Sequence, residues 1–375
     1  HIPFCTVKCL YCDFYSITER EDSIQRFINA ITKEIETCNA DVSKWTIDTI
    51  FIGGGTPSLM SSALVGGILD KIFQLWDMDE NCEITLEANP SSVETKKFKA
   101  FKAAGVNRIS MGIQSLNDNH LKRLGRLHTA SEAIASFEIA RNIFEKTSFD
   151  LIYALQDQSI ESWESELKQA LNLSLEHMSL YQLTIEPGTA FGERYASGRL
   201  RGLPSDDYAS DLFDTTSILC EAHGLPAYEV SNHAQRGSEC RHNLNYWNYG
   251  DYAGIGPGAH GRLTLDGVRY STETYRQPSQ WLSEVSKGCG ESLANPLSDW
   301  DQGVEMVLMG MRLKKGISLQ RFLTLFGKPV APDVIFNLKK DDLIIIEGGH
   351  LRTTHKGTRV LNYVVNEILP DTTLI

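Results

Sequence analysis

The sequence predicts an α/β protein in which a partial, open barrel of six β/α units precedes a winged-helix-like C-terminal module. From residue 22 to about residue 185, amphipathic helical patterns alternate with short apolar strands. Strands separated by single helices form right-handed βαβ units and a parallel sheet. Residues 186–296 are less regular, and from Asp299 helices precede a hairpin pattern. We therefore expect a barrel over residues 1–185, an α/β extension over 186–296 and a C-terminal module over 297–375.

Six apolar runs supply the barrel strands. The first is the short run His1–Phe4, and the others are Thr49–Ile52, Glu83–Leu86, Arg108–Met111, Phe149–Tyr153 and Met178–Leu183. The helical patterns between them cover residues 22–38, 62–75, 92–104, 130–144 and 160–173. Six units fit a partial barrel better than a complete eight-fold one, and polar residues at the carboxyl ends of the strands are expected to line its site.

The clearest element of the extension is a helix near residues 205–223. In the C-terminal module, helices near 299–313, 318–326 and 332–340 precede two apolar runs and a last helix. The runs are joined by Gly348-Gly349, which predicts a type I′ hairpin. Helices followed by a small β-wing predict a winged-helix-like module. Because residues 297–375 hold ten Lys/Arg and nine Asp/Glu, we expect it to pack or bind a partner protein rather than DNA.

Composition narrows the class of protein. The chain of 375 residues is 42% hydrophobic and carries a net charge of −12, which argues against a nucleic-acid partner. No apolar run is long enough to span a membrane. We expect a cytoplasmic protein. The first residue is a histidine inside an apparent strand, so we expect upstream residues to be missing and any targeting segment to be invisible here.

Three cysteines with the spacing C-x3-C-x2-C, namely Cys5, Cys9 and Cys12, suggest the chemistry. Three thiolates on one tight loop can hold three irons of a [4Fe–4S] cluster and leave the fourth iron open. A cluster that only carries electrons normally takes four cysteines. In the radical S-adenosylmethionine (SAM) enzymes, SAM binds the open iron through its amino and carboxylate groups. The pattern therefore predicts Cys5, Cys9 and Cys12 as cluster ligands.

Two other interpretations of these cysteines remain open. A zinc knuckle could use Cys9 and Cys12, with His1 or Cys5 completing it, although structural zinc usually takes four ligands in two separated pairs. A thioredoxin-like Cys-x-x-Cys would leave Cys5 unexplained. The remaining motif in this part of the chain, Gly53-Gly54-Gly55-Thr56-Pro57, lets the backbone approach a ligand closely after the second strand, but it could equally be an ordinary turn.

Taken together, four motifs resemble one family in order along the chain. They are His1–Cys12, Gly53–Pro57, Glu87-Ala88-Asn89-Pro90 and Asn107–Ser115. The chain resembles the radical SAM family of oxygen-independent coproporphyrinogen III oxidases and their heme-chaperone relatives. The resemblance implies a radical SAM barrel with two cofactors, a [4Fe–4S] cluster and SAM.

The resemblance also implies the SAM contacts. The residues concerned are Gly54, Gly55, Thr56, Glu87, Gln114, Arg126 and Asp150. The Gly54–Thr56 segment would meet the methionyl part, and Glu87 the ammonium group or a ribose hydroxyl. Gln114 and Asp150 would hold the ribose hydroxyls. Arg126 would pair with the carboxylate, a task suited to a planar guanidinium. Taken singly, each residue could be an ordinary surface charge or a satisfied polar group at a strand end.

Two features separate the branches of this family. The oxidase branch carries a cysteine two positions beyond the third cluster cysteine, where this chain has Phe14. The chaperone branch carries His-Asn-x-x-Tyr-Trp, matched here by His242, Asn243, Tyr246 and Trp247, with Cys240 just before them. A histidine or cysteine can ligate heme iron, and aromatic rings can face a porphyrin. The alternative is a buried polar histidine in an aromatic cluster that bridges two domains.

One departure from the family pattern lies after Asp150-Leu151-Ile152. The family tends to continue with Gly-Leu-Pro, whereas this chain has Ala154-Leu155-Gln156. The preferred interpretation is a heme chaperone that binds heme and delivers it to a hemoprotein acceptor. The first alternative is the related oxidase, which decarboxylates two propionates of coproporphyrinogen III. A cluster-bearing scaffold without turnover is a further alternative. The sequence names neither the acceptor nor the heme ligand.

Overall fold

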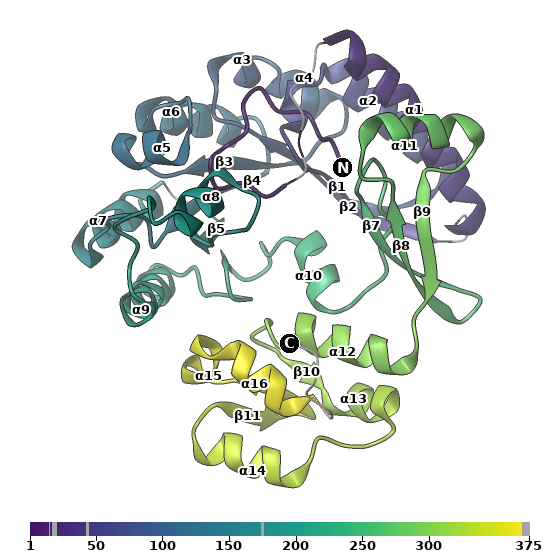
Figure 1. The fold of residues 1–375 in the computed structure, drawn as a ribbon. Coiled ribbons are helices and arrows are strands. Elements are labelled where there is room, and N and C mark those ends of the chain that lie inside the picture. Colours follow the sequence, from purple (N-terminus) through teal and green to yellow (C-terminus); the bar gives the residue numbers. More distant parts are fainter. Residues whose placement is uncertain (15, 17–20, 43–44, 174–175, 370–375) are drawn as a thin grey trace.

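A curled half-barrel sheet forms the centre of the computed structural model, which describes residues 1–14, 16, 21–42, 45–173 and 176–369 (Figure 1). The six strands lie in the order β1-β2-β3-β4-β5-β6, with β1 to β5 parallel and β6 antiparallel to β5. Their bounds are Thr46–Ile52, Asp77–Ala88, Arg108–Gln114, Lys146–Tyr153, His177–Gln182 and Asn232–Ala234. The predicted partial six-stranded barrel is therefore confirmed.

The sixth strand is not the one that the sequence suggested. The sheet gains β6, whereas residues 1–4 form no strand and contribute isolated bridge positions, among them a parallel bridge between Ile2 and Gly54. Ile2 N donates to Gly53 O at 2.8 Å, and Gly55 N donates to Ile2 O at 2.7 Å. These residues therefore pair with the turn that follows β1, rather than with β1 itself.

The helices of the barrel cover its outer face (Figure 1). They are α1 Glu21–Val42, α2 Ser62–Leu75, α3 Ser92–Thr95, α4 Phe98–Ala103, α5 Asp118–Leu124, α6 Ala130–Arg141 and α7 Ile160–Leu171, with a short 3-10 turn at Pro57–Leu59. The sequence did not predict α5, and its pattern over residues 92–104 is divided between α3 and α4. Large apolar side chains such as Phe101, Phe137, Phe149 and Trp163 are fully buried. Burial of this apolar surface is the main stabilising contribution.

The inner face of the sheet is polar because side chains alternate across each strand. Ile109 and Met111 belong to the buried hydrophobic core, whereas the intervening Ser110 contacts the neighbouring strand through Ser148, with 3.2 Å between the hydroxyl oxygens. At the beginning of the strands, Arg108 Nη1 lies 3.4 Å from Glu83 Oε2, and both side chains are almost completely buried. The barrel therefore has an ionic layer at the amino ends of its strands.

The extension contains a second, antiparallel sheet that the sequence interpretation missed. Its helices are α8 Ala190–Ala196, α9 Asp206–Ala222, α10 Arg241–Trp247 and α11 Pro278–Lys287, and its sheet consists of β7 His260–Leu265, β8 Val268–Thr274 and β9 Glu291–Pro296. Asp266 and Gly267 join β7 to β8 with positive φ angles of 49° and 83°. Asp-Gly between two strands is the expected type I′ hairpin signal, so this hairpin was predictable.

The C-terminal module has the predicted helices followed by a small wing. Its elements are α12 Asp299–Gly310, β10 Ile317–Ser318, α13 Leu319–Phe326, α14 Pro332–Lys340, β11 Ile344–Glu347, β12 His350–Thr353, α15 His355–Arg359 and α16 Leu361–Ile368. Gly348 and Gly349 have φ angles of 57° and 77°, as a type I′ turn requires. Among the described residues, no helix is both long and apolar enough to cross a membrane.

Replacement of Glu83 by alanine is expected to lower the free energy of unfolding by about 3–5 kcal/mol, because Arg108 would remain buried without its partner. Lys146 Nζ also lies 3.2 Å from Glu83. Chemical denaturation measures the change. The exposed Glu80 on the same strand is the matched control, and its alanine variant should stay within about 0.5 kcal/mol of the parent. Equal stability of the two variants would contradict this role for Glu83.

Candidate functional site

The cysteine loop is held at the carboxyl ends of the strands by the glycine run after β1. Thr56 N donates to Phe4 O at 2.6 Å, next to Cys5. A Cβ atom on Gly55 would lie 2.5 Å from Phe4 O and 3.0 Å from Cys5 Sγ, so only glycine permits this approach. Thr56 Oγ1 also lies 3.7 Å from Cys5 Sγ. The glycine run therefore positions the first predicted cluster ligand.

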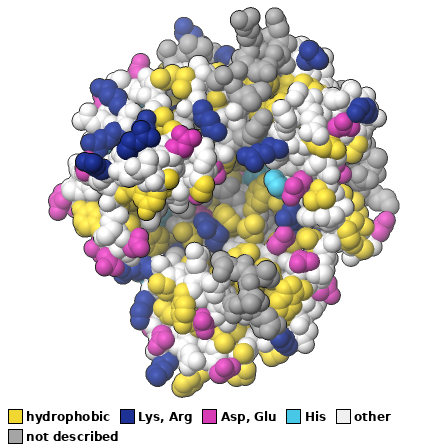
Figure 2. All heavy atoms as spheres, in the orientation of Figure 1, with side chains coloured by type: hydrophobic (Ala, Val, Ile, Leu, Met, Phe, Trp, Pro, Cys, Tyr) yellow, Lys and Arg dark blue, Asp and Glu magenta, His cyan; other side chains and the backbone are white. Residues whose placement is uncertain are grey.

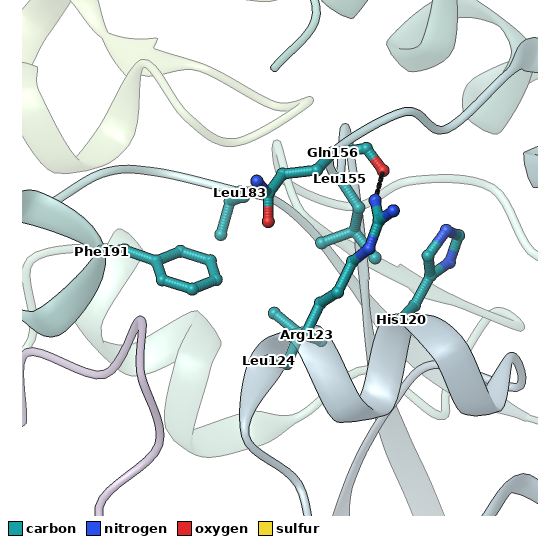
Figure 3. Close-up of a pocket in the computed structure, with 7 residues that line it drawn as sticks. All are labelled: His120, Arg123, Leu124, Leu155, Gln156, Leu183 and Phe191. Carbon is teal, nitrogen blue, oxygen red and sulfur yellow. Dashed lines mark hydrogen bonds between the residues drawn. The ribbon is translucent and has the colours of Figure 1, made fainter. Parts of the chain in front are cut away.

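The opposite side of the loop rests on α5 and α8. Leu10 N donates to Leu124 O at 3.2 Å, and Phe191 N donates to Leu10 O at 2.9 Å. Leu124 and Phe191 also line a small pocket of about 10 Å³ (Figure 3). Across this pocket, Arg123 Nη1 donates to Gln156 O at 2.8 Å. Two separate elements thus fix the height of the cysteine loop over the barrel.

The turn after β4 keeps a glycine-like conformation despite the departure from the family pattern. Ala154 has a φ of 59°, in the left-handed region that glycine adopts most easily. Its side chain is buried at 3% exposure, which places the strained residue inside the core. The turn therefore persists here with alanine, at a cost of about 1–2 kcal/mol in backbone energy.

Arg126 connects the second cysteine to the strand ends. Its Nη1 donates to Cys9 Sγ at 3.3 Å, and its Nη2 donates to Gly112 O at 2.6 Å and Asn89 Oδ1 at 2.8 Å. Asn89 Nδ2 in turn donates to Thr56 Oγ1 at 3.1 Å. Asn89 was recognised only as part of a motif, and the structure identifies it as the residue that joins Arg126 to Thr56.

Two carboxyl groups, Glu87 and Asp150, face the same part of the barrel. Gly54 N donates to Glu87 Oε2 at 3.0 Å. Burial, and secondarily the nearby Asp150 carboxylate, raises the pKa of Glu87 to about 7. Burial likewise raises the pKa of Asp150 to about 6, although hydrogen bonding to Ser179 and the charge of Arg126 oppose the rise. Both groups change charge near neutral pH.

Gln114, at the end of β3, completes the predicted set at the strand ends. It has a φ of 74°, an uncommon backbone conformation for a residue with a side chain. Its side-chain amide packs over Gly112, where an added Cβ would lie 2.9 Å from Gln114 Nε2 and 3.7 Å from Arg126 Nη2. The structure therefore brings Gln114 close to Arg126.

The donor set is chemically compatible with a cluster held by three thiolates. Cys5, Cys9 and Cys12 are partly exposed thiols on one loop, and Arg126 and Thr56 lie against two of the sulfurs. Among the described residues, no three His, Cys, Asp or Glu side chains are gathered in a way that could hold a metal ion. The four-iron cluster is thus supported by the chemistry of its three donors and by the single loop that presents them, and not by side chains already gathered around a metal position.

His242 lies on α10 and packs against β1. Thr49 Oγ1 is 3.2 Å from His242 Nδ1, and the Phe51 and His242 rings are stacked with centroids 4.8 Å apart. The Tyr246 ring meets His242 edge-on, also at 4.8 Å. Burial lowers the pKa of His242 to about 4, so its imidazole is neutral at physiological pH. A neutral imidazole is the form that binds metals.

The neighbours of His242 in the motif have structural contacts instead. Cys240 is 3% exposed, and burial raises the pKa of its thiol to about 11. Asn243 Nδ2 lies 3.5 Å from the Tyr228 hydroxyl, and the Arg312 guanidinium lies 4.6 Å from the centre of the Trp247 ring. These contacts, like those of His242 with Phe51 and Tyr246, also agree with the alternative in which the segment is an aromatic cluster that bridges two parts of the chain.

A cavity of about 620 Å³ runs beside β1 and includes His242 in its lining. Its walls come from β1, from apolar residues of α1 and α2, and from α10 and β7. The aromatic members are Phe14, Trp45, Phe51, Trp76, Tyr246 and Tyr252, and the polar members are His1, Thr46, Asp48, Thr49, Glu87, His242, Asn245, Asp251 and His260. Gly54 and Glu87 reach this lining, whereas the three cysteines, Gln114, Arg126 and Asp150 do not. Figure 2 shows a recess between the barrel and the C-terminal module with hydrophobic side chains inside it.

Comparison with known proteins places the chain in a family. Residues 1–170 match the Radical SAM superfamily model, and residues 297–360 match the HemN C-terminal domain. The heme chaperone HemW of Haemophilus influenzae is 43% identical over 71% of this chain and 70% of its own length, and that of Bacillus subtilis is 34% identical over 99% and 98%. The mitochondrial radical S-adenosyl methionine domain-containing protein 1 of Mus musculus is 35% identical over 99% of this chain and 86% of its own.

These matches show that the barrel is that of a radical SAM protein. This superfamily implies a [4Fe–4S] cluster and SAM. The chain belongs to the family of the heme chaperone HemW. The family resemblance inferred from the motifs is thus confirmed. Coproporphyrinogen III oxidase (HemN) from Escherichia coli has the same fold, with a TM-score of 0.83 over 99% of this chain and 89% of its own, at 20% identity.

The raised pKa of Glu87 predicts a pH-dependent stability. Folding raises this pKa from 4.5 to about 7, so the stabilisation by the protonated form is present at low pH and lost as the pH rises through 7. Between pH 5.5 and pH 7, the free energy of unfolding of the wild type should fall by up to about 2 kcal/mol more than that of the Glu87→Gln variant. Denaturant titrations at several pH values measure this difference. The same pH profile for both proteins would contradict the burial of an ionisable Glu87.

Proposed function

We propose that this protein is a heme chaperone that holds a [4Fe–4S] cluster and SAM at the carboxyl ends of the strands and binds heme at His242. Membership of the HemW family supports the chaperone function, since the relatives in Haemophilus influenzae, Escherichia coli and Bacillus subtilis are heme chaperones. Heme binding at His242 is supported by the position of this residue. It presents a neutral imidazole to a cavity whose volume lies within the usual range of small-molecule sites.

At the strand ends, Cys5, Cys9 and Cys12 would hold three irons of the cluster, which when bound with SAM supplies one-electron cleavage of a carbon–sulfur bond. The Gly54–Thr56 backbone would lie against the methionyl part of SAM. Arg126 would pair its guanidinium with the SAM carboxylate in a charge-assisted contact. Its existing bonds to Asn89 and Gly112 keep the guanidinium in place before SAM arrives.

The remaining SAM contacts would be made by acceptor groups. Glu87 lies next to Gly54 and would accept from the SAM ammonium group or from a ribose hydroxyl. Gln114 and Asp150 would bind the ribose hydroxyls. Because the pKa values of Glu87 and Asp150 lie near 7 and 6, a positively charged ligand would also favour their ionised forms.

At the other site, His242 would ligate the iron, and the rings of Phe51, Tyr246 and Tyr252 would pack against the porphyrin. Tyr246 and Tyr252 lie with ring centroids 4.3 Å apart. Asn243 and Trp247 would act indirectly, since their contacts hold α10 against Tyr228 and Arg312. Heme would then leave for a hemoprotein acceptor.

Coproporphyrinogen III oxidation remains the second candidate, because the fold is shared with an enzyme of that name. Against it, the position two residues beyond Cys12 holds Phe14, which is 57% exposed and has no thiol to offer. Incubation of the reconstituted protein with coproporphyrinogen III, SAM and a reductant tests this candidate. We expect no protoporphyrinogen. Its formation with consumption of SAM would replace the chaperone proposal with the oxidase.

The experiment that tests heme binding is a titration of the anaerobically reconstituted protein with heme, followed by absorbance. The variant His242→Ala should weaken heme binding by about 10-fold or more and shift the Soret band, because the imidazole ligand is lost. The exposed His223, the C-cap residue of α9, provides a control, and His223→Ala should bind heme like the wild type. Iron content and SAM binding should be unchanged in both variants. An identical heme affinity and spectrum in His242→Ala would exclude His242 as the ligand.

A further inference from the structure

We propose that Thr49 is a positioning residue for heme, whose hydroxyl oxygen accepts the Nδ1 proton of His242 and leaves Nε2 to bind the iron. This inference rests on the proposed function and specifies which nitrogen of His242 is used. Thr49 lies on β1, outside every motif that the sequence suggested. Its oxygen is 3.2 Å from His242 Nδ1, within hydrogen-bond distance.

The two ring nitrogens of His242 are in different surroundings. Nδ1 faces Thr49, whereas no hydrogen bond to Nε2 is found among the described residues. A metal binds a nitrogen through its lone pair, so the proton of a neutral imidazole must lie on the other nitrogen. If iron binds Nε2, the proton is on Nδ1, and the Thr49 hydroxyl is placed to accept it. Hydrogen bonding to the second nitrogen fixes the tautomer and increases the donor strength of the ring.

Strand β1 fixes the orientation of the His242 ring as well as its tautomer. Thr49 and Phe51 are two residues apart, so their side chains leave β1 on the same face. The hydroxyl contacts the edge of the His242 ring while the Phe51 ring stacks on it, with an interplanar angle of 20°. Both residues also line the 620 Å³ cavity. One strand therefore supplies a hydrogen bond and a stacking surface to the same imidazole.

The position of α10 is set independently of this contact. Arg241 N donates to Glu83 Oε1 at 2.9 Å, so the first turn of the helix is anchored on β2. Loss of the Thr49 hydroxyl should therefore leave α10 in place and change only the freedom and the tautomer of the His242 ring. This makes the contribution of Thr49 separable from the folding of the segment.

The test compares Thr49→Val, which keeps the shape and removes the hydrogen bond, with Thr49→Ser, which keeps the hydroxyl. Heme affinity is measured by absorbance titration, and the iron–histidine stretching frequency of the ferrous complex by resonance Raman spectroscopy. We expect Thr49→Val to weaken heme binding by about 10-fold, the lower end for a residue that supports a metal ligand. Its stretching frequency should fall, because an imidazole without the Nδ1 hydrogen bond is a weaker donor. Thr49→Ser should match the wild type in both measurements.

Thr324→Val, at an exposed position on α13 outside the lining of the cavity, is the control and should bind heme as the wild type does. If Thr49→Val has wild-type affinity and stretching frequency while His242→Ala loses heme, the role of Thr49 is wrong and the proposed function stands. If His242→Ala keeps the wild-type spectrum, the heme ligand itself is wrong, and Thr49 has no role through it. A loss of affinity in Thr49→Val that Thr49→Ser does not restore would also overturn the inference.

Discussion

The buried carboxylate of Glu83 joins the barrel to the segment that carries His242. Burial alone would raise its pKa, but Arg108 and Lys146 hold the pKa below the ordinary value, so the group is ionised. One oxygen faces these two cations, and the other accepts the backbone N–H of Arg241 and lies 3.5 Å from Cys240 Sγ. A buried charge must be paired to be tolerated. The same pairing therefore closes the amino end of the barrel and places α10 against β1.

The carboxyl end of the barrel depends on close backbone approach instead of charge. Gly55 allows the chain at Phe4 and Cys5 to lie directly against the turn after β1. The resulting loop is then held by Leu124 and Phe191 from the outside and by Arg126 from the inside. In the proposed function, this end receives SAM while α10 presents His242 to the cavity beside β1. Under this proposal, two differently built regions of one barrel would serve two ligands.

The sequence predicted the elements with strong periodicity and the motifs with unusual residues, and it missed features defined by pairing between distant segments. Gly348-Gly349 and the helices of the C-terminal module were predictable because local turn chemistry determines them. The antiparallel pairing of β6 was not, since a three-residue strand has almost no periodicity. Glu83 and Arg108 stood out in the sequence as charged residues inside apolar strands. Their pairing, however, is evident only once the strands are placed side by side in the barrel. No feature of the sequence pointed to Thr49, because its proposed role depends on contact with His242, which lies almost two hundred residues further along the chain.

We propose that the SAM site and the heme site are separate and can be occupied together. The cavity that includes His242 excludes the cysteines, Gln114, Arg126 and Asp150, and shares only the Gly53–Gly54 edge and Glu87 with the strand-end site. The most direct measurement is SAM binding to the reduced, reconstituted protein, followed by the change in the cluster's electron paramagnetic resonance spectrum, with and without one equivalent of heme. If the two sites are separate, the SAM affinity and the spectral change will be the same in both cases. Competition between heme and SAM would contradict it.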